Sequence, residues 1–306
     1  MAILETIIII LGLCLFEVIT SLDNAVINAE VLSSMSAKAK KWFLSWGLIF
    51  AVFIIRGLLP FIIMWMSNPS LGFFQLINVV FSQSPEIIKA IEESAPLLLI
   101  GGGTFLIFLF FHWLFLEPKN FGLKGELFFH RQGIWFYAVV SILLTSFVCL
   151  SIKINPAMAI GAVIGSTAFF ITHGFKENAA QMEERMLEGK TKMTDVSKIL
   201  YLEVIDATFS VDGVLGAFAF TMSIPLILIG NGLGAFVIRS LTIKNIDNVK
   251  KLKYLKNGAM YSIFVLGLVM VLESFGIHIP SLFSPLSTLI IIGFFFYKSL
   301  RELKKS

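Results

Sequence analysis

The sequence predicts an all-α, polytopic membrane protein with about nine transmembrane helices. Three observations lead to this prediction. Hydrophobic residues make up 57% of the 306 residues and charged residues only 14%. The mean hydropathy is +0.88. The apolar residues also fall into runs of roughly 20, the length that a helix needs to cross a hydrocarbon core about 30 Å thick. We therefore expect the lipid bilayer to be the surroundings of most of the chain.

The apolar runs follow one another along the whole chain. The predicted spans are residues 4–32, 42–66, 96–116, 132–152, 157–175, 198–222, 224–243, 257–277 and 284–300. The run at 71–81 is too short to span, so we expect an interfacial or re-entrant segment there. The polar stretch 176–197 is expected to extend the fifth helix into a cytoplasmic loop. This organisation indicates one transmembrane domain, 1–306, with halves at about 1–175 and 198–306.

Most of the 24 Lys and Arg residues lie in alternate loops and at the C-terminus. They follow the first, third, fifth, seventh and ninth predicted spans. The positive-inside rule places such loops in the cytoplasm. This predicts a multi-pass protein of the cell membrane with its N-terminus outside, its C-terminus cytoplasmic and an odd number of spans. Because topology accounts for the net charge of +4, we expect no nucleic-acid partner.

Acidic residues recur at matching spacing in two of the spans. The copy in the first span and the copy in the sixth are, respectively, Glu17, Ser21 and Asp23, and Asp206, Ser210 and Asp212. A charged side chain at mid-bilayer costs at least ~2.5–3.5 kcal/mol, so such residues usually serve a function. An odd number of spans separates the copies, which inverts the second one. Inverted repeats with half-sites near the midplane are typical of transporters.

Helical periodicity divides each copy between two faces. At about 100° per residue, Glu17, Ser21 and Asn24 share a face, and Asp23 lies roughly 120° away. In the sixth span, Glu203, Asp206 and Ser210 share a face, and Asp212 lies off it. Either Asp23 and Asp212 face a different neighbour, or each helix unwinds so that both acids reach one cavity. We favour unwinding, hence broken helices 1 and 6, because Gly213 and Gly216 weaken the sixth helix.

The donor types in these two copies indicate the cargo. Carboxylates, hydroxyls and an amide are hard oxygen donors, which favour Mn²⁺, Mg²⁺ or Ca²⁺ over Zn²⁺ or Cu⁺. The predicted metal ligands are Glu17, Ser21, Asp23, Asn24, Glu203, Asp206, Ser210, Asp212 and Asn231. The cation is expected as a substrate. Closely spaced carboxylates hold protons when no cation is bound, so protons are a candidate coupling ion.

Several polar residues in other spans have two interpretations. Asn231 either completes the coordination or hydrogen-bonds between helices. Arg56 is a candidate counter-ion for the acids, or else faces lipid, and Arg239 either snorkels to the interface or pairs with Glu203. Glu273 with His278 is a weaker candidate for an outer mouth.

The two acidic segments also carry a family resemblance. Glu17-x3-Ser-x-Asp-Asn24 and Glu203-x2-Asp206-x2-Phe209-x2-Asp212-Gly213 resemble the signature segments of the TerC family of integral membrane proteins. That family lies within the wider LysE/TerC-like transporter group, and this chain is most similar to its uncharacterised DUF475 branch. The resemblance implies transport of Mn²⁺ or a related divalent cation, with export as the favoured direction. Gly213 departs from the pattern, because many members have Ser there, and so does the Gly-rich segment around Asn231. Both departures bear mainly on substrate identity.

Two other function classes remain. A membrane sensor or accessory protein would bind metal and supply it to exported enzymes without moving it. An intramembrane metalloenzyme would use bound metal to activate water. The sequence contains no His-Glu-x-x-His and no Gly-x-Ser-x-Gly motif, so we expect no enzymatic activity. The oligomeric state stays open.

Overall fold

The computed structural model describes residues 3–22, 25, 29, 31–32, 34–47, 49–50, 56–67, 72, 85–119, 122–187, 194–244 and 251–304. Within these ranges the regular structure is helical and no strand occurs, which confirms the predicted all-α class. The predicted re-entrant segment at 71–81 falls outside the described residues except for Gly72.

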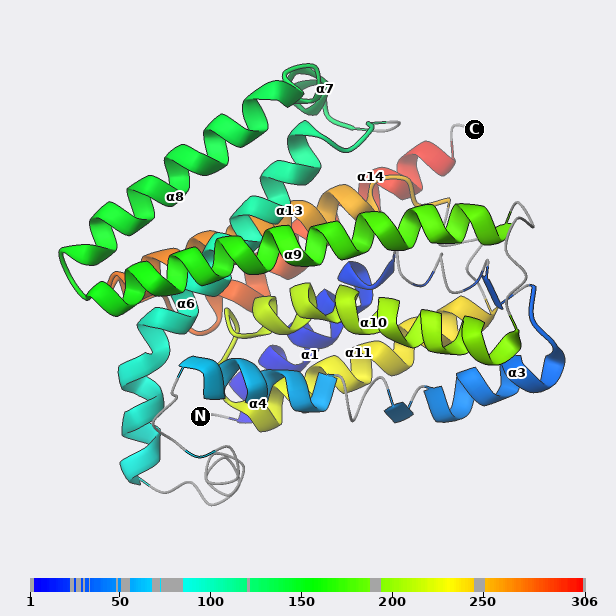
Figure 1. Ribbon diagram of the computed structural model, residues 1–306, viewed down its shortest axis with the longest axis horizontal. Helices are drawn as coiled ribbons and strands as arrows, with labels where there is room; N and C mark the ends of the chain where they lie inside the picture. Colours follow the sequence, from blue (N-terminus) through cyan, green and yellow to red (C-terminus); the bar gives the residue numbers. More distant parts are fainter. Residues whose placement is uncertain are drawn as a thin grey trace.

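Each of the nine predicted spans contains a helix (Figure 1). The first half holds α1 (Ile3–Thr20), α3 (Ala37–Trp42), the π-helical turn η1 (Phe43–Gly47), α4 (Arg56–Ser67), α6 (Pro85–Phe115), α7 (Lys124–His130), the 3-10 turn η3 (Gly133–Trp135), α8 (Phe136–Ile152) and α9 (Pro156–Leu187). The second half holds α10 (Asp195–Ala217), α11 (Ile224–Lys244), α13 (Leu255–Ser274) and α14 (Phe283–Leu303).

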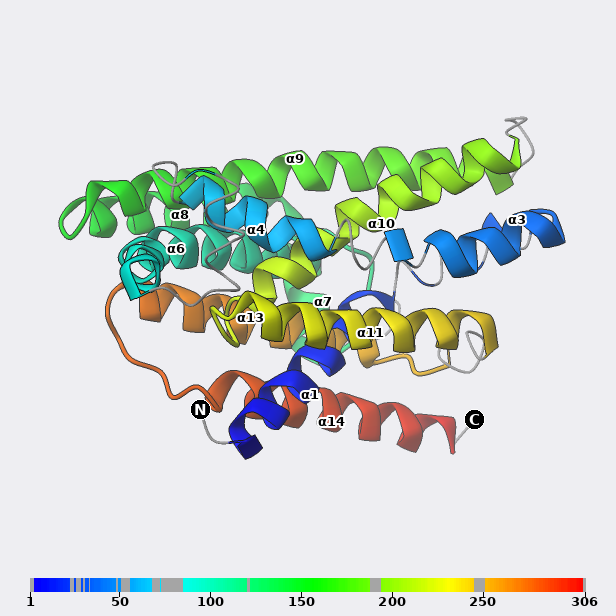
Figure 2. The ribbon, with the colours of Figure 1, turned by 90° about the horizontal axis from the view of Figure 1, so that it is seen from below.

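Seven helices of the described chain are long and apolar enough to cross a membrane. These segments are Ile3–Thr20, Ser94–Phe115, Gly133–Ile152, Pro156–Asn178, Ile224–Leu241, Leu255–Ser274 and Phe283–Leu303. The other two predicted spans hold α4, which is shorter, and α10, which is long enough but carries several charged residues. The chain is therefore a multi-pass membrane protein. The start of α1 and the end of α14 lie toward opposite ends of the long axis (Figures 1 and 2).

Small residues let the central helices approach closely. α6 packs against α13 on one side and α9 on the other, and α8 covers α9. A Cβ at Gly165 of α9 would lie only 2.0 Å from the carbonyl oxygen of Gly101 on α6, so both helices need glycine at this crossing. Such small-residue contacts are the usual way in which membrane helices pack. Next to the crossing, Phe108 and Phe169 meet edge to face with ring centroids 5.8 Å apart.

Several neighbour relations between helices fit the expected inverted repeat. Exchanging α1 for α10, α4 for α11 and α6 for α13 turns the contact of α1 with α11 into that of α10 with α4, and the contact of α1 with α13 into that of α10 with α6. The pairs α1 with α10, α4 with α11 and α6 with α13 map onto themselves. Figures 1 and 2 show α1 and α10 running in opposite directions. This pair therefore has the opposed directions that an inverted repeat predicts.

The predicted break in the sixth helix does not occur. α10 is continuous from Asp195 to Ala217 and passes through Ser210 and Asp212 without interruption. Gly213 and Gly216 instead allow α1 to pack closely against α10. A Cβ at Gly213 would lie 2.7 Å from Glu17 Oε2, and a Cβ at Gly216 would lie 2.5 Å from the Phe16 ring.

α1 ends at Thr20, and the predicted ligands Asp23 and Asn24 lie outside the described residues. α9 continues to Leu187 and α10 begins at Asp195, so much of the stretch 176–197 is helical. The extension expected for the fifth helix therefore occurs.

Candidate functional site

Arg56, the first residue of α4, connects the two acidic copies. Its Nε lies 2.8 Å from Glu17 Oε1 on α1, and its Nη1 lies 2.8 Å from Asp206 Oδ2 on α10. Nη2 donates a longer bond of 3.4 Å to Asp206 Oδ1. Glu17, Arg56 and Asp206 are 1%, 3% and 5% exposed. The two repeated acids therefore share one buried guanidinium, which has the planar donor fork suited to carboxylates. Of the two interpretations of Arg56, its contacts with these acids are those of a counter-ion.

Glu17 fits between α10 and α11 because both helices have glycine where it passes. Gly213 of α10 faces its carboxylate, and a Cβ at Gly234 of α11 would lie 2.6 Å from Glu17 Cβ. Ser21, one turn along, donates from Oγ to Glu17 Oε1 at 2.7 Å. Glu17 and Ser21 thus lie on one face, as their spacing predicts. Glu17 Oε1 accepts from both Ser21 and Arg56, which fixes its orientation.

The second serine has a different bond from the first. Ser210 is 1% exposed, and its Oγ donates to the backbone carbonyl of Asp206 at 2.5 Å. Bonding back to the preceding turn is common for serine inside helices. Ser210 therefore contacts the main chain of the acid that precedes it rather than a carboxylate.

Glu203 lies one turn before Asp206 and faces Arg239 of α11. Its Oε1 is 3.7 Å from Arg239 Nη2, which is an ion pair but too long for a hydrogen bond. Neither Glu203 oxygen has a hydrogen-bond partner among the described atoms, nor does Arg239 Nη2. The guanidinium carbon of Arg239 lies 4.3 Å from the centre of the Phe43 ring. Of the two interpretations of Arg239, pairing with Glu203 is the observed one, and the pair is loose.

Asp212 faces α9 rather than Arg56. Its Oδ2 lies 2.5 Å from Lys176 Nζ, and its buried Oδ1 has no hydrogen-bond partner within the described part of the chain. For this copy, the interpretation that the off-face acid meets a different neighbour is therefore correct, and unwinding is not needed. Lys176 was not predicted as part of the site, because it lies at the start of the polar stretch.

Asn231 is 1% exposed and lies on α11 between two glycines that contact α1. Neither its Oδ1 nor its Nδ2 has a hydrogen-bond partner among the described atoms. The interhelical hydrogen bond considered for Asn231 is therefore not seen in the described chain. Its amide remains a polar group inside the helix bundle.

Sequence reasoning also missed a histidine pair close to Lys176. His112 of α6 and His173 of α9 have ring centroids 3.8 Å apart. His173 stacks on Phe169, and His112 meets Phe136 edge to face. The two histidines are 61 positions apart in the sequence, so no local pattern indicates that they meet.

The carboxylates are arranged as ion pairs rather than as a closed metal cage. Within the described ranges, no three or more His, Cys, Asp and Glu side chains come together as a group that could hold a metal ion. The buried oxygens of Glu203, Asp212 and Asn231 without hydrogen bonds are nevertheless the donor types that hard divalent cations accept. A buried polar atom without a partner costs about 1–3 kcal/mol, so each calls for an explanation.

Comparison with known proteins gives one match. A family model described as "Protein of unknown function (DUF475)" matches residues 22–306. No curated protein and no solved structure matches the chain.

Proposed function

We propose that this chain, which belongs to the DUF475 family, is an integral membrane transporter of divalent metal cations with Mn²⁺ as its favoured substrate. The observation that supports the proposal most is the group of buried acids on α1 and α10. Glu17 and Asp206 come from opposite halves of the repeat and meet at Arg56. Sites formed where inverted halves meet are typical of secondary transporters.

A purely structural role explains the acids less well. Buried ion pairs of structural importance are normally satisfied by further hydrogen bonds, because desolvation costs several kcal/mol per ion. Within the described residues, both oxygens of Glu203, one oxygen of Asp212 and the side-chain amide of Asn231 have no hydrogen-bond partner. These groups are oxygen ligands of the kind that Mn²⁺, Ca²⁺ and Mg²⁺ bind. The similarity of the acidic segments to TerC proteins favours Mn²⁺ and favours export.

The proposed transport step is a competition between the cation and the fixed cationic side chains. Arg56 stays protonated at all ordinary pH values, so a metal ion that takes Glu17 or Asp206 must move the guanidinium aside. Lys176 holds Asp212 in the same way, so a cation that binds Asp212 must move its ammonium aside. Asp212 and Lys176 are thus a second place at which the metal and a fixed cation compete. Protons remain the proposed coupling ion, because closely spaced carboxylates favour protonation when no cation is bound.

Flux into proteoliposomes tests this proposal. Purified protein is reconstituted, Mn²⁺ is added outside, and entry is followed with a trapped metal-sensitive dye. Wild type is expected to accumulate Mn²⁺, and Asp206→Asn is expected to lose the flux while eluting as a folded protein. Protein that binds Mn²⁺ but moves none, in wild type, would instead support the accessory role of supplying metal to exported enzymes.

A further inference from the structure

A cavity of about 450 Å³ lies at the end of the bundle where α10 joins α11 and α13 joins α14. It is bounded by the segment 218–222, the segment 276–284 and the start of the transmembrane part of α6. Ser281 of the wall donates a hydrogen bond to Glu5 near the start of α1, so the cavity opens at the N-terminal end of that helix. The positive-inside rule assigns this end to the outer face.

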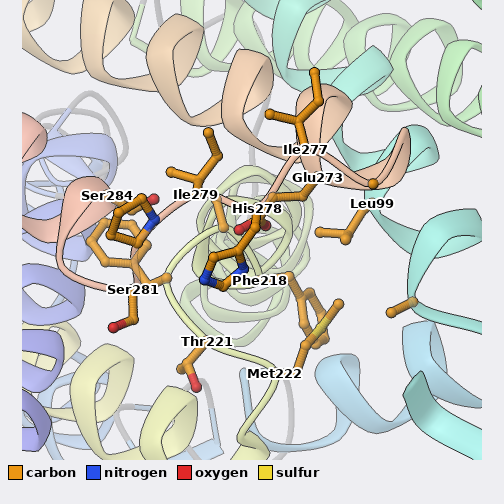
Figure 3. A pocket seen from close by; sticks show the side chains of 15 residues that line it. Leu99, Phe218, Thr221, Met222, Glu273, Ile277, His278, Ile279, Ser281 and Ser284 are labelled. Atoms are coloured by element: carbon orange, nitrogen blue, oxygen red, sulfur yellow. The ribbon is translucent and has the colours of Figure 1, made fainter.

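Two metal-ligating side chains share this cavity. Figure 3 shows the carboxylate of Glu273 and the imidazole of His278 next to each other among its lining side chains. Thr221, Ser281 and Ser284 contribute hydroxyls to the same walls. A carboxylate, an imidazole and hydroxyls form a mixed oxygen and nitrogen donor set, which suits Mn²⁺ and other divalent transition metals.

Glu273 and His278 lie on either side of an ordered helix end. The N–H of Ile277 donates to the Leu272 carbonyl at 3.1 Å, and that of Gly276 donates to the Glu273 carbonyl at 2.9 Å. This bond pair, with Gly276 at φ +82°, is the Schellman motif. A Cβ at Gly276 would meet nothing within 4 Å, so glycine is needed here for its backbone conformation alone. The turn thus brings His278 back toward the last turn of α13.

Two aromatic rings lie between the cavity and the buried acid Glu17. Phe220 lines the cavity and contacts Phe16 with ring centroids 5.6 Å apart. Phe16 in turn packs at Gly216 and precedes Glu17 in the chain. A cation in the cavity is therefore near the pathway of the acids without touching them.

We propose that Glu273 and His278 form an outer divalent-cation site, at which the transported metal is bound on the external side of the Phe16 and Phe220 rings. Its role as a station of the pathway rests on the proposed transport function. Only two charged or imidazole ligands contribute, so the site binds weakly and exchanges quickly. A Kd on the order of 0.1–1 mM is expected, as for calcium sites of extracellular modules. Fast exchange suits an exit site and would be lost in a closed cage of ligands.

A spin label in the cavity tests the site locally. Ala95→Cys, at a lining residue without a metal-ligating group, is made with Cys14→Ala and Cys149→Ala, labelled with a nitroxide in detergent and titrated with Mn²⁺. Bound Mn²⁺ broadens the nitroxide spectrum with a saturable dependence on concentration, and collisions with free Mn²⁺ give only an unsaturable rise. The saturable part is expected with Glu273 and His278 intact, and it is expected to vanish in Glu273→Gln and in His278→Gln.

The matched control is Glu302→Gln, the same change at the other end of the bundle, and it should keep the saturable broadening. Gly276→Ala leaves both ligands in place but strains the turn, so half-saturation should move to several-fold higher Mn²⁺. Unchanged saturable broadening in both ligand variants, or none with the ligands intact, would overturn the inference. Because binding in detergent needs no transport, a saturable site without proteoliposome flux would refute only the transport proposal. Proteoliposome flux by protein that shows no saturable broadening would refute only the outer site.

Discussion

Lys176 Nζ on α9 lies 2.5 Å from Asp212 Oδ2 on α10, inside the membrane-spanning part of the bundle. The other oxygen of Asp212 is buried and has no hydrogen-bond partner among the described atoms. One carboxylate thus has a fixed cationic partner on one side and an unbonded donor oxygen on the other. This pair is where the proposed competition between the metal and a fixed cation makes its clearest prediction.

Lys176→Arg should keep the charge that neutralises Asp212 but hold this carboxylate with a planar donor fork that suits it better. We expect folded protein in which Mn²⁺ flux falls, because the metal competes less well with the guanidinium for Asp212. Lys176→Met should destabilise the protein in thermal unfolding, because leaving one member of a buried pair without its partner costs about 3–5 kcal/mol. Lys38→Met, at an exposed lysine, is the control. Mn²⁺ flux at the wild-type rate in Lys176→Arg would exclude competition between the metal and the fixed cation at Asp212.

Arg56→Met removes the guanidinium that Glu17 and Asp206 share. Thermal unfolding in detergent should show destabilisation of about 3–5 kcal/mol, since two buried carboxylates then lie together without a counter-ion. Added Mn²⁺ should restore more stability to this variant than to wild type, because the metal takes the place of the lost charge. The exposed Arg301 serves as control through Arg301→Met. An equal Mn²⁺ response in Arg56→Met and wild type would contradict competition between metal and Arg56.

Gly213→Ala places a Cβ 2.7 Å from Glu17 Oε2 and should push that carboxylate away from Arg56. We expect reduced Mn²⁺ flux although alanine is the better helix former. Gly293→Ala on α14 is the matched control, because a Cβ there meets nothing within 4 Å. Flux measured per folded protein should fall in the first variant and stay unchanged in the second. If Gly213→Ala transports normally, then the close fit of Glu17 against α10 is not needed.

Substitution of Glu126 on α7 is expected to lower the stability of the protein and to leave transport unchanged. It is 1% exposed and accepts hydrogen bonds from Asn257 Nδ2 at 2.7 Å and from the Tyr261 hydroxyl at 3.1 Å. Glu126→Ala leaves both donors of α13 without this partner, at a cost of about 1–3 kcal/mol for each buried group. The melting temperature should fall while flux per folded molecule is kept. A flux loss without a stability loss would instead assign Glu126 to the pathway.

The spans could be predicted from sequence because a bilayer requires apolar runs of a fixed length. Glu17 and Asp206 could be singled out for the same reason, since acids are scarce in apolar segments, and both are buried. That these two share Arg56 did not follow from spacing. Periodicity gives the face on which a residue lies, but not which helix is packed there.

Gly213 and Lys176 show most clearly which contacts the sequence pattern could not predict. A glycine within a span is compatible with a bend and with a close helix contact, and only the position of α1 decides between them. Lys176 belongs to a polar stretch by sequence, yet α9 continues there as a helix and brings the side chain to Asp212. Both outcomes depend on contacts between segments far apart in the chain.

The central claim is that the repeated acids exchange a divalent cation for protons, and one reconstitution experiment tests it most directly. Mn²⁺ and internal pH are recorded together in proteoliposomes that contain wild type or Asp23→Asn combined with Asp212→Asn. We predict Mn²⁺ flux with opposing proton movement in wild type and neither signal in the double variant. Folded wild-type protein that binds Mn²⁺ but produces no flux, or a double variant that transports as wild type does, would contradict the claim.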